Sequence, residues 1–187
     1  MGSRYEVRLS GEGGQGLILA GVILAEAAAI YDDKNAIQTQ SYGPEARGGA
    51  CKSEVIISED EIDYPKATRI DLLLALTQEA ADKYAGELKK GGILIVDSFS
   101  VERIPEEDFR VFRLPILETA RDKIGKSIVA NIVALGAIIG LSGIVSRAAI
   151  EKALMARVPK GTEQLNFQAL AAGFEMAASP KEESRNS

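Results

Sequence analysis

The chain begins with a strict alternation of apolar and polar residues, in which Tyr5, Val7 and Leu9 take every second position. This alternation is typical of a strand with one buried face. From Leu17 to about Ile30, the apolar residues instead recur at the spacing of a helix. The pattern therefore predicts a strand followed by a helix.

Strands and helices then continue to alternate. Strand patterns occupy residues 35–41, 53–58 and 111–113. Apolar runs, typical of strands covered on both faces, occupy residues 70–76, with Asp71 as the one polar residue, and residues 93–96. Helix patterns occupy residues 78–88, 127–141, 146–156 and 162–177. The pair Gly91-Gly92 is expected to end the first of these helices, and Ser146 and Thr162 are expected to cap the last two.

This order predicts an α/β fold with one open, mostly parallel sheet, helices on both faces and a helical C-terminal third, Rossmann-like in type. We expect residues 4–177 to form a single domain, since neither a repeat nor a linker divides them. Residues 178–187 are polar at their end and are expected to form a disordered tail.

Composition then removes several classes of chemistry. The 187 residues include one cysteine, Cys51, and no histidine. An internal disulfide cannot form, and the four cysteine ligands of an iron–sulfur cluster are missing. Without histidine the chain also lacks the commonest general base and the commonest zinc ligand, so we expect no metal site.

Charge and hydropathy bear on the partners. The net charge is −5, and aromatic residues make up 5% of the chain, so nothing indicates nucleic-acid binding. The apolar run from Ile128 to Val145 is interrupted by Asn131 and by glycines, which favours a buried helix over a membrane span. A strand pattern starts almost at once, without a secretory signal before it, and we expect a cytoplasmic protein.

A glycine-rich turn separates the first strand from the first helix. Gly11, Gly13 and Gly16 have the spacing of the dinucleotide-binding fingerprint, with Gly14 and Gln15 between the last two. Glycine lets a backbone approach a ligand closely, and the helix N-terminus offers free amides to an anion. However, the second strand ends without the ribose-binding acid of that fingerprint. Three interpretations stay open: a tight turn, a loop that binds an anion or a partner, and a nucleotide cradle.

A second loop follows the second strand. It starts at Gln40 and Ser41 and includes Tyr42, Gly43, Pro44, Glu45, Arg47, Gly48 and Gly49. Loops at the carboxyl ends of strands line the ligand crevice of α/β sheets. The alternative is a solvated loop with a Glu45–Arg47 contact of little energetic value.

Three single residues also need an explanation. Cys51 is interpreted as an unreactive buried thiol, because the chain has no histidine to activate it. Asn131 lies in an apolar helix and is expected to hydrogen-bond a neighbouring loop. Asp97 ends a buried strand, where it could be a functional acid or the cap of the next turn.

Taken together, these motifs resemble the gamma subunit of 2-oxoacid:ferredoxin oxidoreductases over residues 4–177. The resemblance rests on Ser10-Gly11-Glu12-Gly13-Gly14-Gln15-Gly16 and on Gln38-Thr39-Gln40-Ser41-Tyr42-Gly43-Pro44-Glu45-Ala46-Arg47-Gly48-Gly49. It extends through Glu54-Val55-Ile56-Ile57, Ile62-Asp63-Tyr64-Pro65, Gly91-Gly92-Ile93-Leu94-Ile95-Val96-Asp97-Ser98 and Asn131-Ile132-Val133-Ala134-Leu135-Gly136. The second loop resembles the 2-oxoglutarate type more than the pyruvate type.

The resemblance implies the fold of domain III of pyruvate:ferredoxin oxidoreductase and a place in a multi-subunit enzyme. Such an enzyme decarboxylates a 2-oxoacid oxidatively, forms an acyl-coenzyme A (succinyl-coenzyme A from 2-oxoglutarate) and reduces ferredoxin. Thiamine diphosphate and Mg²⁺ belong to alpha and beta subunits, and [4Fe-4S] clusters to a ferredoxin-like delta subunit. The gamma subunit binds neither cofactor and has no activity alone.

The resemblance also suggests roles for the two loops. Gly11, Gly13, Gly14, Gln15 and Gly16 are candidates for binding coenzyme A or facing a partner, as is Arg47 through its cation. Interface candidates are Gln40, Ser41, Tyr42, Gly43, Pro44, Glu45, Gly48, Gly49 and Asn131. Two further hypotheses are a free-standing nucleotide-binding enzyme or sensor of the NAD or FAD type, and an interaction scaffold.

Overall fold

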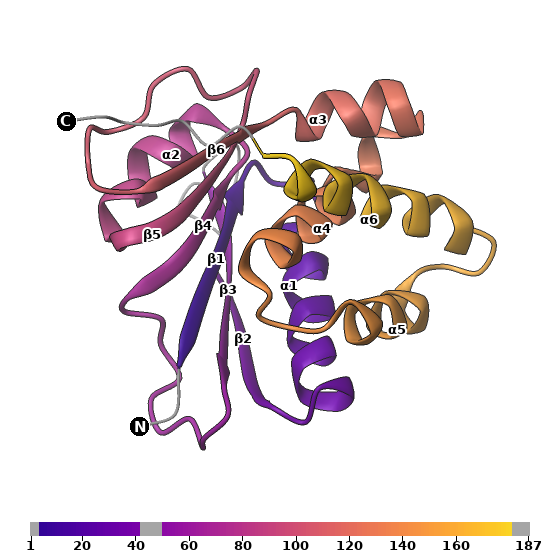
Figure 1. The fold of residues 1–187 in the computed structure, drawn as a ribbon, viewed down its shortest axis with the longest axis horizontal. Coiled ribbons are helices and arrows are strands. Elements are labelled where there is room, and N and C mark those ends of the chain that lie inside the picture. The colour runs from indigo at the N-terminus through magenta and orange to yellow at the C-terminus, as the bar shows by residue number, and fades with distance from the viewer. Residues whose placement is uncertain (1–3, 42–49, 181–187) are drawn as a thin grey trace.

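The computed structural model describes residues 4–41 and 50–180. Within them, six strands form one sheet in the order β2-β3-β1-β4-β5-β6 (Figure 1). The strands are β1 (Tyr5–Gly11), β2 (Asn35–Ser41), β3 (Cys51–Ser58), β4 (Ile70–Ala75), β5 (Leu88–Asp97) and β6 (Arg110–Leu114).

The sheet is mostly parallel, as predicted. β1 pairs in parallel with β4, β4 with β5, and β5 with β6. β3 is antiparallel to both of its neighbours, β1 and β2, so β2 runs in the same direction as β1. Among the described strands, β3 alone runs against the others.

Helices cover both faces of the sheet. The α-helices are α1 (Leu17–Glu26), α2 (Gln78–Tyr84), α3 (Ile116–Glu118), α4 (Ala130–Ser142), α5 (Arg147–Arg157) and α6 (Glu163–Ala178). Shorter turns are the π-helical η1 (Ala27–Tyr31) and η3 (Thr119–Ile124) and the 3₁₀-helical η2 (Ala85–Glu87) and η4 (Ser127–Val129). Figure 1 shows α1, α4, α5 and α6 on one side of the sheet and α2 on the other.

Each face of the sheet contributes to a separate apolar core, because successive side chains of a strand point to opposite faces. Leu72 and Leu74 of β4 belong to the larger core beneath α1, α4, α5 and α6. Leu73 and Ala75 belong to the smaller core beneath α2. The apolar run Leu72–Ala75 of β4 is therefore explained by burial on both faces, as predicted.

Two glycines bring α4 and α6 into close contact. A Cβ atom on Gly136 would lie 2.2 Å from the carbonyl oxygen of Leu170, and one on Gly173 would lie 2.0 Å from that of Val133. The small residues of α4 thus pack against α6 of the same chain.

Charged side chains fasten β1 to its surroundings. On the α2 face the almost fully buried Arg8 forms ion pairs with Glu54 at 2.6 Å and Glu87 at 2.7 Å, and its guanidinium lies 5.0 Å from the centre of the Tyr84 ring. Removing Glu54 or Glu87 would leave the buried Arg8 cation short of a partner and would destabilise the fold. The cluster therefore links β1, β3 and η2.

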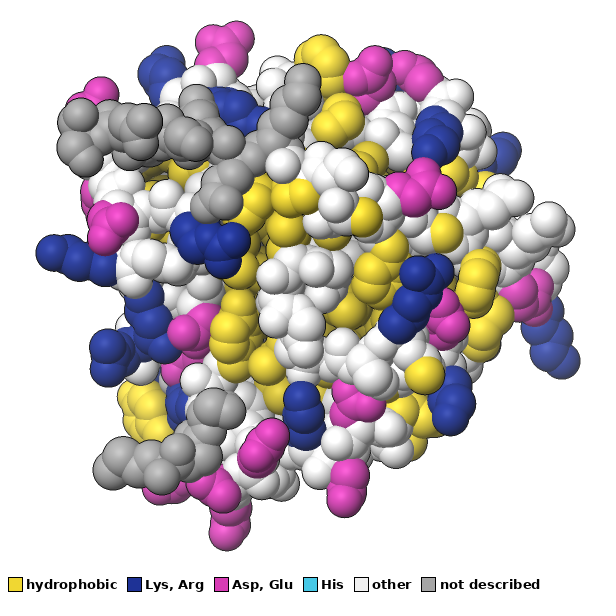
Figure 2. All heavy atoms as spheres, viewed as in Figure 1, with side chains coloured by type: hydrophobic (Ala, Val, Ile, Leu, Met, Phe, Trp, Pro, Cys, Tyr) yellow, Lys and Arg dark blue, Asp and Glu magenta, His cyan; other side chains and the backbone are white. Residues whose placement is uncertain are grey.

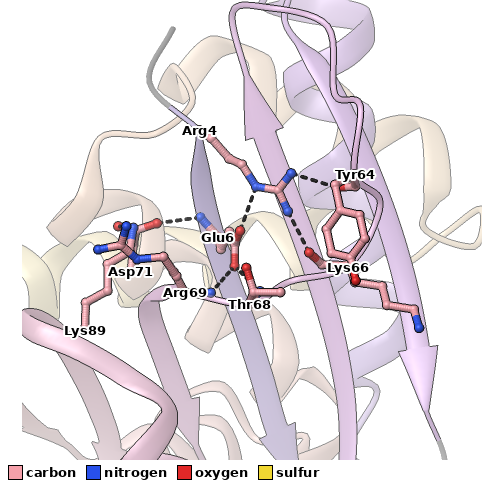
Figure 3. Close-up of polar contacts among 8 residues, drawn as sticks. All are labelled: Arg4, Glu6, Tyr64, Lys66, Thr68, Arg69, Asp71 and Lys89. Atoms are coloured by element: carbon pink, nitrogen blue, oxygen red, sulfur yellow. Dashed lines mark hydrogen bonds and ion pairs between the residues drawn. The ribbon is translucent and has the colours of Figure 1, made fainter. Parts of the chain in front are cut away.

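A second polar cluster holds the segment that contains Tyr64 (Figure 3). The carboxylate of Glu6 accepts hydrogen bonds from the side chain of Arg4 and from the backbone amides of Thr68 and Arg69, at 2.6–2.7 Å. Arg4 in turn donates to the carbonyl oxygens of Tyr64 and Lys66. These bonds account for the fixed course of the loop between β3 and β4.

Several element boundaries differ from the prediction. Gly91 and Gly92 lie inside β5 and do not end a helix; α2 and η2 have already ended at Glu87. Gly91 has φ +70° next to an irregularity in the pairing of β4 and β5. A positive φ favours glycine there just as it does at the end of a helix. A helical segment formed by α3 and η3 (116–124) was not predicted.

Of the two predicted helix caps, one is confirmed and the other makes no side-chain capping bond. Ser146 caps α5, since its Oγ accepts a hydrogen bond from the amide of Ala149 at 3.1 Å. Thr162 precedes α6 but makes no side-chain capping bond; its hydroxyl donates to the carbonyl of Pro159 instead. α6 ends at Ala178, one residue beyond the predicted domain limit, and the expected tail lies outside the described residues from 181 onward.

Candidate functional site

The glycine turn joins the carboxyl end of β1 to α1 and is partly held by its own atoms. The side-chain oxygen of Gln15 accepts a hydrogen bond from the amide of Glu12 at 2.7 Å. Gly14 and Gly16 have φ of +91° and +73°, which side chains rarely adopt. No side chain caps α1, so the amides of its first turn are left for solvent, a ligand or a partner.

Asn131 fixes this turn from the helical layer. Its Nδ2 donates to the carbonyl oxygen of Gly16 at 3.0 Å, and its Oδ1 accepts from the amide of Ile132 at 2.9 Å. A Cβ atom on Gly16 would lie 2.6 Å from Nδ2 of Asn131. The structure thus brings two sequence-predicted site residues together and gives Asn131 a loop-holding hydrogen bond.

The second predicted loop starts at the same edge of the sheet. Gly11 pairs with Cys51 and Ser41 pairs with Lys52, so the carboxyl ends of β1 and β2 meet there. Gln40 and Ser41 are exposed at the end of β2. The remaining predicted residues lie outside the described part of the chain: Tyr42, Gly43, Pro44, Glu45, Arg47, Gly48 and Gly49.

A pocket of about 380 Å³ lies beside the glycine turn. It is lined by Gly14, Gln15, Leu117, Arg121, Ser127, Ile128 and Ala130. The side chain of Ile128 is 79% exposed, unusual for an isoleucine at the start of a core helix. Sequence reasoning missed Leu117, Arg121, Ser127 and Ile128: the first two belong to the unpredicted helical segment, and Ile128 is hidden in an apolar run.

Arg121 gives this pocket its cation. Its guanidinium binds Asp122 through two hydrogen bonds of 2.7 and 2.8 Å. These hydrogen bonds raise the pKa of Arg121 and lower the pKa of the Asp122 carboxyl, so the cation beside the pocket is paired with a carboxylate. Charged side chains of both signs lie mostly toward the rim of the face shown in Figure 2, with apolar side chains among uncharged atoms across its middle.

Asp97 and Cys51 have structural surroundings. Asp97 is fully buried, and its carboxylate accepts hydrogen bonds from the amides of Phe99, Ser100 and Leu117 at 2.9–3.2 Å. Of the two interpretations, the cap of the following turn is therefore correct. Burial raises the pKa of the Cys51 thiol, which disfavours the reactive thiolate.

The chemical repertoire of this edge is narrow. In residues 4–41 and 50–180, no group of three side chains among His, Cys, Asp and Glu is arranged to hold a metal ion. None of the helices in this part of the chain is long and apolar enough to cross a membrane. This edge has uncapped backbone amides, a cation paired with Asp122 and apolar side chains, which suit binding better than bond-making chemistry.

The sheet also departs from the standard dinucleotide-binding fold. In that fold the second strand lies beside the first and ends in an acid that binds ribose. Here β3 lies between β1 and β2, and β2 ends in Gln40 and Ser41. The glycine spacing is thus present without the strand that would complete a nucleotide site.

Fold and site together define an α/β protein with a Rossmann-like sheet and a glycine turn at its carboxyl edge. The chain belongs to the pyruvate ferredoxin/flavodoxin oxidoreductase family, whose sequence profile matches residues 6–176.

Relatives within this family share most of the chain. The 2-oxoglutarate synthase subunit KorC of Methanocaldococcus jannaschii is 53% identical over 176 residues, which are 93% of this chain and 94% of the relative. The KorC subunit of Methanothermobacter thermautotrophicus is 49% identical over 179 residues, 92% of this chain and 95% of its own. The pyruvate synthase subunit PorC of Methanothermobacter marburgensis is 27% identical over 174 residues, 91% and 96% of the two chains.

A solved structure agrees with this assignment. The gamma subunit of a keto/oxoacid ferredoxin oxidoreductase from Geobacter sulfurreducens superposes with a TM-score of 0.89 and 56% identity, covering 96% of this chain and 99% of its own. The higher identity to the two KorC subunits than to the PorC subunit favours the 2-oxoglutarate type over the pyruvate type.

Proposed function

We propose that this chain is the gamma subunit of a multi-subunit 2-oxoglutarate:ferredoxin oxidoreductase. The complex converts 2-oxoglutarate and coenzyme A to succinyl-coenzyme A and carbon dioxide, and passes the electrons to ferredoxin. The observation that carries this proposal is the 53% identity to a 2-oxoglutarate synthase subunit along 93% of the chain, against 27% to a pyruvate synthase subunit.

The proposed partners are alpha and beta subunits that bind thiamine diphosphate with Mg²⁺, and a ferredoxin-like delta subunit with [4Fe-4S] clusters. Thiamine diphosphate supplies the decarboxylation chemistry, and the clusters carry the electrons. A cluster of this kind takes four cysteine ligands, whereas the chain has Cys51 alone and that thiol is buried. We therefore assign the clusters to a partner. By its resemblance to the family, we also assign the thiamine cofactor to the partners and the assembly to the cytoplasm.

The work of this chain, in our proposal, is done by the carboxyl edge of its sheet. The glycine turn (Gly11–Gly16) offers backbone amides to a phosphate of coenzyme A or to a partner, with Asn131 holding it in position. Arg47 pairs with a coenzyme A phosphate or a partner carboxylate. The segment from Gln40 to Gly49 forms the rest of the face turned toward the other subunits.

Two substitutions in the assembled complex test this assignment. Gly13 is exposed, has no neighbouring atom within 4 Å of an added Cβ and lies outside the left-handed region, so Gly13→Ala leaves the fold intact. We expect each substitution to raise the KM for coenzyme A, or to weaken subunit assembly, by about tenfold. Arg47→Ala removes one charge-assisted bond of about 1.4 kcal/mol, whereas the methyl of Gly13→Ala keeps a ligand or partner away from the amides of the turn.

Gly86→Ala is the matched control, because Gly86 also has open space around an added Cβ but lies on the opposite side of the sheet, after α2. It is expected to leave assembly and turnover unchanged. If the complex with Arg47→Ala or Gly13→Ala keeps its turnover, its assembly and its KM for coenzyme A, the proposed role of these residues is wrong.

A further inference from the structure

A second pocket, of about 330 Å³, lies at the end of the sheet opposite the glycine turn. Its lining includes Tyr5, Asp71, Lys89, Lys90, Gly91 and Arg110. Tyr5 begins β1 and Arg110 begins β6, whereas the glycine turn follows the carboxyl end of β1. The pocket is therefore separate from the carboxyl edge to which the proposed function refers.

The pocket lies where β5 bulges away from β4. From Ile70 to Leu72 β4 advances by two residues, while its partner β5 advances by five, from Leu88 to Ile93. Within this bulge Gly91 has φ +70°, and its amide donates a hydrogen bond to the carbonyl oxygen of Asp108 at 2.6 Å. Bulges of this kind redirect side chains and are frequent beside functional sites.

The pocket has more hydrogen-bond donors than its own acceptors can use. Asp71 is the one carboxylate among its described lining residues, and both of its oxygens are engaged. They accept hydrogen bonds from the amide of Glu6 at 2.8 Å and from Nζ of Lys89 at 2.5 Å (Figure 3). Within residues 4–41 and 50–180, neither the hydroxyl of Tyr5 nor the ammonium of Lys90 has a hydrogen-bond partner.

The charges around Tyr5 add to this excess of donors. Burial, and then the charge of Asp71, raise the pKa of Tyr5 to about 12, and Arg110 acts on it in the opposite direction. The phenol therefore keeps its proton at neutral pH and is able to donate it. Three cationic side chains and one carboxylate line this pocket, in a chain whose net charge is −5.

The end of α4, which borders the pocket through Ser142, does not cancel this positive charge. The C-terminus of a helix carries about half of one negative elementary charge, less than the full charge of a lysine. Two of the last carbonyl oxygens are also engaged. That of Ile138 accepts from Oγ of Ser142 at 2.7 Å, and that of Ile139 from the amide of Gly143 at 2.8 Å.

We propose that this pocket binds the phosphate group of a small molecule. Ammonium and guanidinium groups are common partners of phosphate, and the phenol supplies a neutral donor. Because Asp71 holds Lys89 and the carbonyl of Asp108 holds the bulge, these donors are positioned before a ligand arrives, which lowers the entropic cost of binding. The volume is at the low end for small-molecule sites and suits inorganic phosphate or a small phosphomonoester.

The test is a titration of the full-length chain with inorganic phosphate and, separately, with glycerol 3-phosphate. Calorimetry measures the Kd of each, and sodium chloride at equal ionic strength is the reference. We expect saturable binding. Tighter binding of inorganic phosphate would identify the free anion as the ligand, and tighter binding of glycerol 3-phosphate a phosphorylated metabolite.

Three variants connect this binding to the pocket. Lys90→Glu is expected to weaken it at least about tenfold, and Tyr5→Phe about threefold, because one cation and one neutral donor are lost. Lys160→Glu is the matched control, since Lys160 is also an exposed lysine without an ion pair in the described part of the chain, and lies outside the pocket. It is expected to leave the Kd unchanged.

Thermal unfolding without phosphate checks that Lys90→Glu keeps the fold, as expected for an exposed side chain. The absence of saturable binding of both probes to the wild-type chain would overturn the proposal. Equal Kd values for Lys90→Glu and Lys160→Glu would also overturn it. The proposal is independent of the oxidoreductase function, since the binding is measured on the chain itself.

Discussion

Gly16 shows how a single residue connects the glycine turn to the helical layer. Its backbone is left-handed, with φ +73°, and its carbonyl oxygen receives the hydrogen bond of Asn131. The sequence motif marks Gly16 as necessary but does not say why. The structure gives two reasons, the dihedral angle and the amide of Asn131 in the space that a side chain would need.

These two reasons predict the effect of one methyl group. We expect Gly16→Ala to lower the free energy of unfolding by about 1–3 kcal/mol, because the residue must adopt a strained conformation and displace Asn131. Gly13→Ala in the same turn is expected to change it by less than about 0.5 kcal/mol. Urea denaturation of the two variants measures the difference, and equal stabilities would contradict this explanation of the turn.

Tyr5 gives a pH-dependent prediction. Burial, and then the charge of Asp71, raise the pKa of Tyr5 to about 12 from an ordinary 10.0. Between these values the unfolded chain loses the phenol proton while the folded chain keeps it, so the stability contributed by Tyr5 falls as pH rises through this window. Denaturation at several pH values should show a shallower loss in Tyr5→Phe than in wild type. Identical pH profiles for the two proteins would refute the assignment.

Among the elements, the predicted strands were found close to their expected positions because their patterns depend on burial alone. The runs Leu72–Leu76 and Ile93–Val96 are apolar without interruption, and their strands are covered on both faces. The direction of a strand within the sheet was harder to predict than its position in the sequence. Nothing in the alternation of residues 53–58 distinguishes an antiparallel strand between β1 and β2 from a parallel one, because the side-chain period is the same.

The sequence was misleading where one residue type serves two purposes. Gly91-Gly92 was interpreted as a helix end, but a positive φ is needed equally at an irregularity in a strand. The segment 116–124 was missed because it is short, begins after Pro115 and forms a π-helical turn with charged residues. At the site, the glycine turn and Asn131 were predicted, whereas Ile128 and Arg121 depend on long-range packing.

The close contact between α4 and α6 predicts how a substitution in α6 changes the stability of the protein. An added methyl at Gly173 would meet the carbonyl of Val133 and the amide of Ala137, both backbone atoms that cannot move alone. Gly173→Ala is therefore expected to force the helices apart and to cost about 1–3 kcal/mol or more. Thermal unfolding checks this against Gly86→Ala, which has open space. An unchanged melting temperature in Gly173→Ala would show that the two helices are not packed so closely.

At the scale of the whole molecule, the scarcity of catalytic residue types and the binding surface at the carboxyl edge both fit a subunit of a larger enzyme. The chain has a sheet between two apolar cores, no histidine, one buried thiol, and a carboxyl edge with uncapped amides beside a pocket of about 380 Å³. A free-standing enzyme with this inventory would lack most catalytic groups. The proposed subunit does not need them, because in the proposed assembly the partners supply the cofactors.

The most direct test is reconstitution of the oxidoreductase with and without this chain. Reduction of ferredoxin that depends on both 2-oxoglutarate and coenzyme A is followed for the complete complex, for the complex lacking this subunit and for the isolated chain. The account predicts turnover by the complete complex with 2-oxoglutarate preferred over pyruvate, a loss of that turnover without this subunit, and none by the chain alone. Full 2-oxoglutarate turnover by the remaining subunits, or dinucleotide-dependent turnover by the isolated chain, would contradict it.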